Sequence, residues 1–439
     1  MERMAMSQLL EWKNSPQRKP LILRGARQVG KTWLARQFGT QHYDNTLYVN
    51  FDAQSVSGPL KQIFEGDLDP QRIVRALDAL HGQQTNPGST LLILDEIQAV
   101  PRALTSLKYF EEQAPEYHVI AAGSHLGLNL HPGASLPVGK VNILRLSPLT
   151  FTEFLTAVGY AQIATAITDL DWELLAVLHD RVVELLRQYL FVGGMPEAVL
   201  RYAESKRLAD ASVAQRELLE LIRADFSKHA PTAHLARLWQ VWDSIPVHLA
   251  KENKKLVWGT IRPGARARDF ELALQWLIDY GVAYPVRRVT KPGLPLAAYV
   301  EEGIFKLFSL DVGLLAAMAG LDQATAVSGD ALFSEFRGAL AEQYVHQQLV
   351  AVAPDIRPYY WAGKAAEIDF VMQFGPVIVP IEVKAGEARK SQSLRSYLDR
   401  FAPAYAVRMS MSRFRPQDTF TNVPLYAAQM LPAIIAAAV

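Results

Sequence analysis

The feature that most constrains the fold of this chain is a glycine-rich segment. The segment matches the pattern G-x-x-x-x-G-K-[ST] with Gly25, Ala26, Arg27, Gln28, Val29, Gly30, Lys31 and Thr32. An apolar run, Leu21–Arg24, precedes it, and helix-forming residues follow as far as Phe38. Between a strand and a helix, such a loop turns its backbone N–H groups toward bound phosphates. An ordinary glycine turn before a helix is the alternative.

Two side chains of this segment have predicted roles of their own. The ammonium group of Lys31 is expected to reach the β- and γ-phosphates of a nucleotide and to act in catalysis. The hydroxyl group of Thr32 is expected to bind Mg²⁺. We therefore interpret the segment as the Walker A loop of a nucleotide site, with ATP and Mg²⁺ as cofactors.

Short apolar runs alternate with helical segments up to about residue 150, which predicts an α/β domain with a parallel sheet. Residues 1–150 are therefore assigned to a P-loop NTPase core. The expected strands are Leu21–Arg24, Thr46–Phe51, Leu91–Leu94, Val119–Ala122 and Val141–Leu146.

Polar side chains follow two of these strands, at the edge of the sheet where the Walker A loop begins. Asp95 and Glu96 come directly after the strand at 91–94. Asp95 is expected to hold Mg²⁺, and Glu96 to orient and deprotonate the attacking water, which would make the site hydrolytic. Ser124, after the strand at 119–122, is the candidate sensor of the γ-phosphate. A solvated turn for Asp95 and Glu96, and a turn cap for Ser124, are the alternatives.

The composition is that of a globular protein with two to three domains: the chain has 439 residues, half of them hydrophobic and a fifth charged. A formal net charge of +1 predicts no overall attraction to nucleic acid or to an acidic membrane. The sequence holds no cysteine, which excludes disulfides and thiolate metal sites. Residues 1–16 lack the apolar segment of a secretion signal, and the apolar tail is about half as long as a membrane span. A cytoplasmic protein is therefore expected.

The remainder of the chain changes its periodicity twice. Helical spacing dominates after residue 150, and an extended stretch at Val282–Val289 follows further helices. The expected segments are a helical lid at 151–229, a helical segment compatible with a winged helix at 230–320, a linker at Gly320–Asp330 and a second α/β domain at 331–439.

Five motifs occur in order along the chain. They are the Walker A loop, Asp95–Gln98, Gly123–Ser124, Leu146–Phe154 and Gly193–Pro196. With them the chain resembles, over nearly its full length, a bacterial and archaeal family of AAA-type, STAND-like ATP-binding proteins. In that family the ATPase domain is followed by a domain of unknown function (number 4143) that is restriction-endonuclease-like. The resemblance implies that Pro196 packs against the nucleotide, and a helix-breaking Gly-Pro joint is the alternative.

Four side chains in the last segment match the order of a PD-(D/E)XK nuclease: Glu342, Asp369, Glu382 and Lys384. Residues two apart on a strand share a face, so Glu382 and Lys384 project together, with Asp369 on the other strand of a hairpin. The carboxylates could hold Mg²⁺ or Mn²⁺ against a scissile phosphate, with Glu342 completing the site and Lys384 polarising the water or the phosphate. An exposed ion pair on an edge strand is the alternative. The resemblance favours the nuclease-like fold and leaves cleavage open.

DNA or RNA is a further candidate partner, whereas no membrane partner is expected. The observation is a basic cluster in the middle segment, for which a solvated helix face is the alternative. The cluster consists of Lys251, Lys254, Lys255, Arg262, Arg266 and Arg268.

Two hypotheses follow from the sequence. The first is a magnesium-dependent ATPase that acts as a nucleotide-driven switch coupled to a nuclease-like C-terminal domain. The second is a slowly hydrolysing regulatory or scaffold protein whose C-terminal domain recognises a partner without cleavage.

Overall fold

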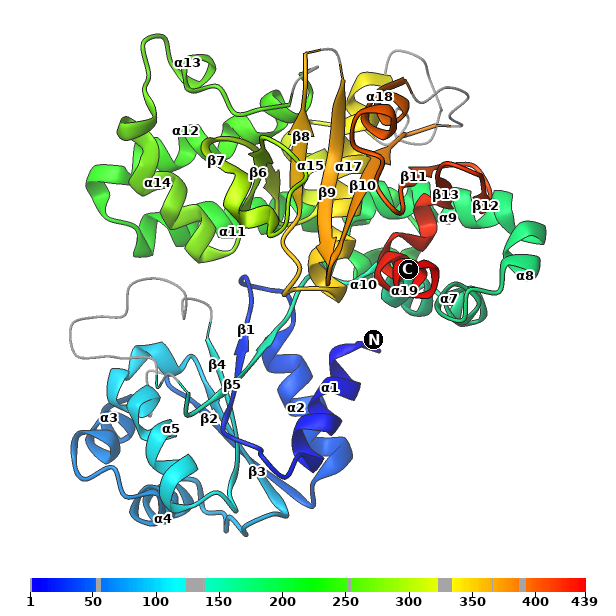
Figure 1. Cartoon of the computed structure of the whole chain (residues 1–439). Coiled ribbons are helices and arrows are strands. Elements are labelled where there is room, and N and C mark those ends of the chain that lie inside the picture. Colours follow the sequence, from blue (N-terminus) through cyan, green and yellow to red (C-terminus); the bar gives the residue numbers. More distant parts are fainter. Residues whose placement is uncertain are drawn as a thin grey trace. The chain divides into compact units, whose positions relative to one another are not determined.

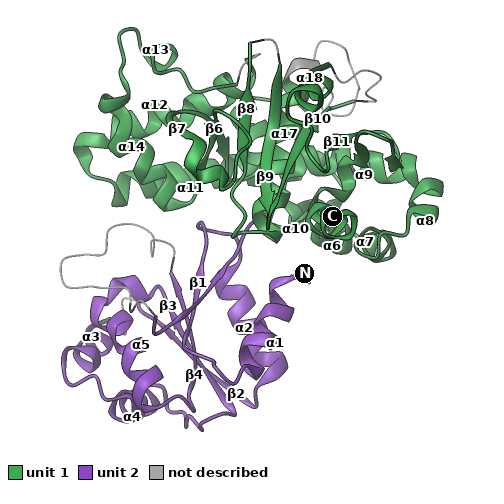
Figure 2. Cartoon of the chain, viewed as in Figure 1, with its two compact units in different colours: residues 1, 148–439 green, residues 2–147 purple. Residues whose placement is uncertain are grey.

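The chain forms two compact units, Glu2–Ser147 and Pro148–Val439 (Figure 2). The computed structural model describes residues 2–52, 57–123, 137, 139–251, 254–322, 334–364, 366–386 and 392–439. The predicted sensor, Ser124, and most of the linker expected at Gly320–Asp330 lie outside the described residues.

The unit Glu2–Ser147 is an α/β domain built on one parallel sheet. Its strands follow the order β2-β3-β4-β1-β5. Figure 1 shows α1 and α2 on one face of the sheet and α3, α4 and α5 on the other. Each strand begins and ends within one residue of its predicted bounds, so the prediction of a parallel α/β domain is confirmed. The elements are α1 Ala5–Asn14, β1 Leu21–Arg24, α2 Lys31–His42, β2 Asn45–Asn50, α3 Ser57–Glu65, α4 Pro70–His81, β3 Thr90–Asp95, η1 Ile97–Ala99, α5 Pro101–Gln113, β4 His118–Gly123 and β5 Asn142–Arg145.

The order of the strands places the nucleotide motifs together. Strands β3 and β4 are buried at every residue, because helices cover both faces of a parallel sheet. Strand β1 lies between β4 and β5, and β3 pairs with β4 on the far side. Since parallel strands end at the same edge, the loop after β1 and the carboxylates after β3 share that edge.

A buried histidine lies at the opposite end of the same sheet, where β4 begins. The hydroxyl of Tyr43 and Nδ1 of His118 share a hydrogen bond of 2.6 Å, and Trp12 contacts the histidine ring edge-on. Burial lowers the pKa of His118 to about 4, and the nearby Arg18 and Lys13 act in the same direction. The ring is therefore neutral in the folded unit at physiological pH.

The unit Glu2–Ser147 is expected to lose stability in acid because of this histidine. The pKa of His118 is lower in the folded than in the unfolded chain, so the unfolded chain takes up the proton first as the pH falls. Stability is complete above about pH 6.5 and is lost toward pH 4, by about 2 kcal/mol at pH 4.5. Urea unfolding of the wild type and of His118→Gln at pH 7 and pH 4.5 measures this loss. An equal acid loss in both proteins would contradict the assignment, and His81→Gln is the matched control.

The unit Pro148–Val439 combines many helices with an eight-stranded mixed sheet, in the order β12-β13-β11-β10-β9-β8-β6-β7 (Figure 1). Its helices are α6 Phe151–Ala157, α7 Ala161–Thr168, α8 Trp172–Val177, α9 His179–Val192, α10 Pro196–Ser205, α11 Leu208–His229, α12 Thr232–Leu249, α13 Trp258–Ile261, α14 Ala267–Tyr280, η2 Leu296–Tyr299, α15 Val312–Met318, α17 Ser334–Val352, α18 Gln392–Phe401, η4 Leu425–Met430 and α19 Leu431–Ala438. Its strands are β6 Ala283–Val289, β7 Val300–Ser309, β8 Tyr359–Ala362, β9 Glu367–Phe374, β10 Val377–Val383, β11 Val407–Ser410, β12 Arg415–Pro416 and β13 Thr421–Pro424.

The hairpin of β6 and β7 belongs to this large sheet and is not the wing of a separate winged-helix domain. Three helices, α12 to α14, precede it in the expected order, but β6 also pairs in parallel with β8 through Arg288 and Val289. This pairing satisfies the backbone groups of β6 that a free hairpin would leave at an edge. The segments 230–320 and 331–439, predicted as separate domains, therefore share one sheet.

The motif Gly193–Pro196 lies between α9 and α10 in a buried hydrogen-bond network. The backbone N–H of Gly194 donates to Asp311 Oδ2 at 2.7 Å, and the N–H of Leu149 donates to the carbonyl of Gly194 at 2.7 Å. Gln347 of α17 donates to the same Asp311 oxygen at 2.9 Å. The network joins the start of α6, the end of α9, the start of α15 and the middle of α17. These local contacts explain why both positions are glycine, and the explanation requires no bound nucleotide.

Replacing Gly193 with alanine is expected to destabilise the unit Pro148–Val439 by about 3 kcal/mol. Gly193 has φ 75° and ψ −166°, a conformation open only to glycine, and a Cβ atom there would lie 2.1 Å from Asp311 Oδ1. Urea unfolding followed by tryptophan fluorescence measures the change, because only Trp12 and Trp33 lie outside this unit. The control is Gly303→Ala, since a Cβ at Gly303 meets nothing within 4 Å. Equal stability of the two variants would contradict the assignment.

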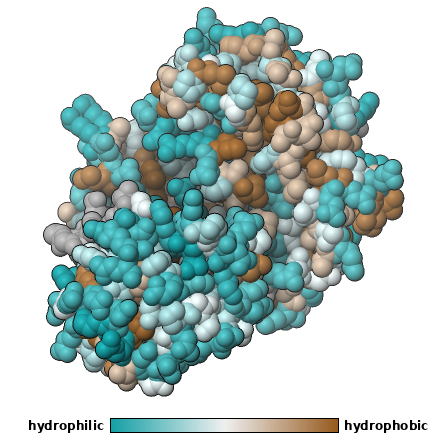
Figure 3. Space-filling view, turned by 60° about the horizontal axis from the view of Figure 1, so that its bottom comes forward, coloured by the Kyte–Doolittle hydropathy of each residue, from teal (hydrophilic) through white to brown (hydrophobic). Residues whose placement is uncertain are grey.

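Among the described residues, no helix has both the length and the apolar character needed to cross a membrane. In the view of Figure 3, hydrophobic residues form small groups among hydrophilic ones.

Candidate functional site

The loop between β1 and α2 has the conformation that its glycines permit. Gln28 and Gly30 have positive φ values of 65° and 94°. A Cβ atom at Gly25 would lie 2.3 Å from the backbone carbonyl oxygen of Leu146, so only glycine fits there. The loop curls before the N-terminus of α2, whose first residue is Lys31. Such a curled loop before a helix is the backbone geometry of a phosphate site.

The side chain of Lys31 lies inside this loop. Its Nζ donates hydrogen bonds to the carbonyls of Gly25 at 3.0 Å and Ala26 at 2.8 Å. Burial lowers the pKa of Lys31 to about 8, while Glu96 and Asp95 favour the charged form. The ammonium group is thus held at the centre of the loop.

The end of β3 brings its carboxylate to the first turn of α2. Asp95 is buried, and its Oδ2 accepts a hydrogen bond of 2.8 Å from the hydroxyl of Thr32. The same oxygen accepts a second hydrogen bond of 2.8 Å from the hydroxyl of Tyr48 on β2. Burial and this hydrogen bond raise the pKa of Tyr48, so the phenol stays a donor. A hydroxyl and a carboxylate 2.8 Å apart are oxygen ligands of the kind that Mg²⁺ prefers, so these residues fit the predicted metal.

Glu96 has a backbone conformation that is rare for its residue type. Its φ of 52° and ψ of 40° fall in the left-handed region, and it directly precedes η1. Its Oε2 accepts a hydrogen bond of 2.5 Å from Nε2 of Gln98. A non-glycine residue in this region costs about 1–3 kcal/mol, and such strain clusters at functional sites. The turn and Gln98 together fix the direction of the Glu96 carboxylate.

Two supporting residues were missed from the sequence. Tyr48 lies in a predicted strand, but only the pairing of β2 with β3 shows that its hydroxyl meets Asp95. Arg3 is buried and donates to the carbonyls of Val29 at 3.0 Å and Ser147 at 2.6 Å. It therefore ties the Walker A loop to the residue that ends this unit. No local motif marks either residue.

Three of the four predicted nuclease-like residues lie on one helix and two antiparallel strands of the unit Pro148–Val439, whereas Lys384, expected on the same strand as Glu382, directly follows the end of that strand. Glu342 lies on α17, Asp369 on β9 and Glu382 on β10, and the hairpin of β9 and β10 turns at residues 375–376 as expected. The backbone N–H of Val383 donates to Asp369 Oδ2 at 2.7 Å. A pocket of about 690 Å³ is lined by Lys251, Lys254, Glu342, Ala362, Gly363, Lys364, Ala366, Glu367, Asp369, Val383, Lys384 and Ser393.

A lysine that the sequence analysis did not single out lies among these carboxylates. Lys306 of β7 is fully buried, and its Nζ lies 2.6 Å from Glu367 Oε1, 3.2 Å from Glu342 Oε2 and 3.7 Å from Asp369 Oδ1. Lys254 forms a second ion pair with Glu342. Part of the predicted basic cluster is therefore turned inward.

The charges of this cluster determine its protonation. Burial opposes the ionisation of Glu342, but Lys306 and Lys254 outweigh it and hold the pKa of Glu342 at about 2. Burial, together with the charge of Glu342, raises the pKa of Asp369 to about 7. Burial disfavours the ammonium of Lys306, yet the surrounding carboxylates raise its pKa above the usual value.

Glu382 is the least satisfied member of the cluster. It is 1% exposed, and its Oε1 lies 3.1 Å from Nζ of Lys384. Among the described residues, neither of its carboxylate oxygens accepts a hydrogen bond. The described part of the chain also holds no group of three or more histidine, cysteine, aspartate or glutamate side chains arranged for a metal ion. Because Lys306 already lies among three carboxylates, these residues do not fit a divalent metal as they stand.

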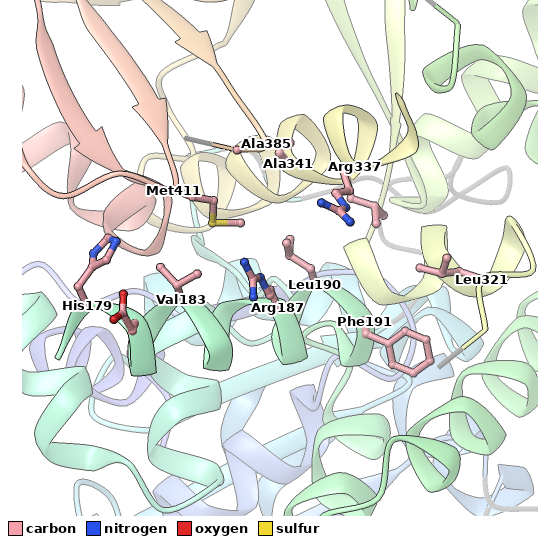
Figure 4. A pocket seen from close by; sticks show the side chains of 13 residues that line it. His179, Val183, Arg187, Leu190, Phe191, Leu321, Arg337, Ala341, Ala385 and Met411 are labelled. Atoms are coloured by element: carbon pink, nitrogen blue, oxygen red, sulfur yellow. The ribbon is translucent and has the colours of Figure 1, made fainter. Parts of the chain in front are cut away.

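A second cavity, of about 430 Å³, lies in the same unit between α9 and α17 (Figure 4). Arg187 of α9 and Arg337 of α17 point into it from opposite walls. The residues that line it include none of those predicted as site residues from the sequence.

Three parts of the chain match known families. Residues 17–155 match the family described as "AAA domain". Residues 183–325 and 337–428 match two families described as domains of unknown function, DUF8612 and DUF4143. These matches confirm the predicted AAA-type P-loop domain and the predicted domain of unknown function. No curated protein matches the chain.

Several solved structures share a partial similarity with this chain. The Walker-type ATPase of Pyrococcus abyssi is 15% identical over 72% of this chain and 95% of its own, with a TM-score of 0.44. The Aeropyrum pernix Orc1 protein in complex with DNA is 14% identical over 72% of this chain and 90% of its own, with a TM-score of 0.27. A third structure is a signal transduction ATPase with numerous domains (STAND) from Pyrococcus horikoshii, which has a tetratricopeptide repeat sensor. It is 12% identical over 81% of this chain and 46% of its own, with a TM-score of 0.26. At these TM-scores the similarities carry no argument about this chain.

Proposed function

We propose that this chain is a magnesium-dependent ATPase whose nucleotide site consists of the Walker A loop and the end of β3. One observation carries the proposal: the hydroxyl of Thr32 donates to the carboxylate of Asp95 at 2.8 Å, and the ammonium of the preceding residue, Lys31, lies inside the glycine loop. A hydroxyl, a carboxylate and an ammonium group thus converge on one curled glycine loop. These are the groups that hold a magnesium nucleotide in P-loop proteins.

Each residue has a distinct role in the proposed reaction. The backbone N–H groups of the loop bind the phosphates, and Lys31 pairs with the β- and γ-phosphates. Bound Mg²⁺, held by Thr32 and Asp95, would neutralise phosphate charge. Glu96 orients a water and accepts its proton as the water oxygen bonds to the γ-phosphorus, and ADP leaves with the bridging oxygen. Tyr48 positions Asp95 through its hydrogen bond.

The outer contacts of the nucleotide remain part of the proposal. Ser124 would sense the γ-phosphate, and Pro196 would contact the nucleotide. The hydrogen bonds of Gly194 support the alternative for this motif, a structural joint between α9 and α10. One motif can serve both purposes. The hydrogen bonds of the joint are made by Gly194, whereas Pro196 is the first residue of α10.

The output of the ATPase is proposed to be the unit Pro148–Val439. Nucleotide binding and loss would act as a switch on this unit, by ordering and releasing segments that contact the γ-phosphate. The positions of Glu342, Asp369 and Glu382 on one helix and two paired strands, with Lys384 directly after the second strand, support a nuclease-like arrangement.

One observation favours recognition without cleavage over an active nuclease. The ammonium groups of Lys306 and Lys254 already pair with carboxylates that would have to hold a catalytic metal. The pocket that these carboxylates line also presents Lys251, Lys364 and Lys384, which suit the phosphates of DNA or RNA. We therefore propose that this unit binds a phosphate-bearing partner and does not cut it.

A cleavage assay separates these two functions. We expect the wild type to hydrolyse ATP and to leave single- and double-stranded DNA and RNA intact, with Mg²⁺ or Mn²⁺ and with or without ATP. The reason is that Lys306 already pairs with carboxylates that would otherwise have to bind the catalytic metal. Gel analysis of the nucleic acids beside Lys384→Ala is the measurement. Metal-dependent cleavage that disappears in Lys384→Ala would establish the nuclease instead.

A further inference from the structure

We infer that Lys306 is the resident cation of the nuclease-like cluster, so that the cluster holds an ammonium group where a cleaving nuclease would hold a divalent metal ion. The inference rests on the nuclease-like arrangement of Glu342, Asp369 and Glu382 proposed above. It goes beyond that proposal because it assigns a chemical occupant to the cluster and a role to a residue of β7.

The contacts of Lys306 are those of a bound cation. Its side chain has no exposed surface, and three carboxylates surround Nζ at 2.6, 3.2 and 3.7 Å. The ring of Tyr360 completes the surroundings, with its centroid 5.1 Å from Nζ. A buried ammonium group is stable only where such partners offset its desolvation. The cluster therefore supplies a dedicated cation site, which Lys306 fills.

A divalent ion cannot share this site with Lys306. A magnesium ion bound to the Glu342 oxygen that lies 3.2 Å from Nζ would come within about 5 Å of the ammonium. Two cations at that distance repel each other strongly where water does not screen them. One of the candidate ligand oxygens is also engaged, because Asp369 Oδ2 accepts a hydrogen bond of 2.7 Å from the N–H of Val383.

The carboxylate of Glu382 does not change this conclusion. It is the one member of the cluster whose oxygens accept no hydrogen bond from the described residues. However, Lys384 lies 3.1 Å away and supplies its counter-charge. A single carboxylate beside an ammonium is a weaker metal site than the paired carboxylates of the predicted arrangement.

The test is to remove the ammonium and measure metal binding. Mn²⁺ is titrated calorimetrically into the full chain without nucleotide, in an Asp95→Asn background so that the carboxylate of the proposed nucleotide site does not contribute. We expect Lys306→Met in this background to bind Mn²⁺ at least tenfold more tightly than the Asp95→Asn protein that retains Lys306. Mn²⁺ should also raise the melting temperature of the Lys306→Met variant. The matched control is Lys255→Met, because Lys255 is exposed and its backbone pairs with that of Lys306.

A second variant covers the case in which Lys306→Met does not fold without metal. Lys306→Met combined with Glu367→Gln removes one of the carboxylates together with the ammonium, and it should gain the same Mn²⁺ binding. Failure of both variants to gain Mn²⁺ binding would overturn the inference. Tight Mn²⁺ binding by the Asp95→Asn protein with Lys306 intact, if it were lost on Glu382→Gln, would also overturn the inference. Hydrolysis of ATP, measured with Asp95 intact, reports on the ATPase proposal separately.

Discussion

Replacing Lys31 with alanine is expected to abolish ATP binding, with a rise of at least about 100-fold in the dissociation constant. Lys31 is the only residue of the Walker A loop whose ammonium lies inside the curl of the backbone, where it now bonds to the carbonyls of Gly25 and Ala26. Without it, the phosphates would lose their ammonium partner inside the loop. Titration with a fluorescent ATP analogue in the presence of Mg²⁺ measures the loss.

The control for this variant is Lys61→Ala. Lys61 is a largely exposed lysine of α3 that pairs with Glu65 on the surface, so its removal takes away the same charge from the same unit. We expect its affinity for ATP to equal that of the wild type. Circular dichroism of both variants checks that the fold is retained. Binding by a folded Lys31→Ala within threefold of the wild type would refute the proposed nucleotide site.

Replacing Glu96 with glutamine is expected to lower the rate of ATP hydrolysis by about 100- to 1,000-fold while leaving ATP affinity unchanged. The amide keeps an oxygen that can accept the hydrogen bond from Gln98, so the orientation fixed by the turn survives. It cannot take up the proton of the attacking water, so only turnover is lost. Release of inorganic phosphate measures turnover, and equilibrium binding measures affinity.

A carboxylate elsewhere in the same unit provides the comparison for Glu96→Gln. Glu116→Gln changes an exposed glutamate in the loop before β4 and should retain full turnover. Normal hydrolysis by Glu96→Gln would overturn the assignment of the base. A loss of ATP binding in the same variant would show that Glu96 acts on the bound nucleotide instead of on the water.

The nucleotide site was largely predictable because its signals are local. A contiguous glycine loop, the strand before it and the helix after it fix the position of Lys31 and Thr32 with few alternatives. The strand 90–95 ends at Asp95 and is followed by Glu96, and parallel pairing brings this end of the strand to the loop. The sequence did not predict that Tyr48 contacts Asp95 or that Arg3 contacts Val29 of the loop. Side chains from distant segments meet only once the sheet has formed.

The middle of the chain was predicted less well. Periodicity gave the helix Ala267–Tyr280 and the strand Ala283–Val289 close to their observed positions. It did not reveal that this strand pairs with β8, more than seventy residues later in the chain, and so joins the C-terminal sheet. Strand pairing depends on backbone groups that every residue carries, so the partner of a strand leaves little trace in its own sequence.

The sequence by itself determined which residues form the proposed ATP site, since those expected to meet the phosphates are neighbours along the chain. The tertiary structure alone decided the character of the nuclease-like cluster. Glu342, Asp369, Glu382 and Lys384 were all identified from their spacing, but the residue that sets their charge, Lys306, lies on the distant strand β7. A buried lysine has no local motif, because its partners are defined only by the packing of the sheet against α17. Two of the carboxylates that spacing assigned to a metal, Glu342 and Asp369, therefore lie in the folded chain against the ammonium group of Lys306.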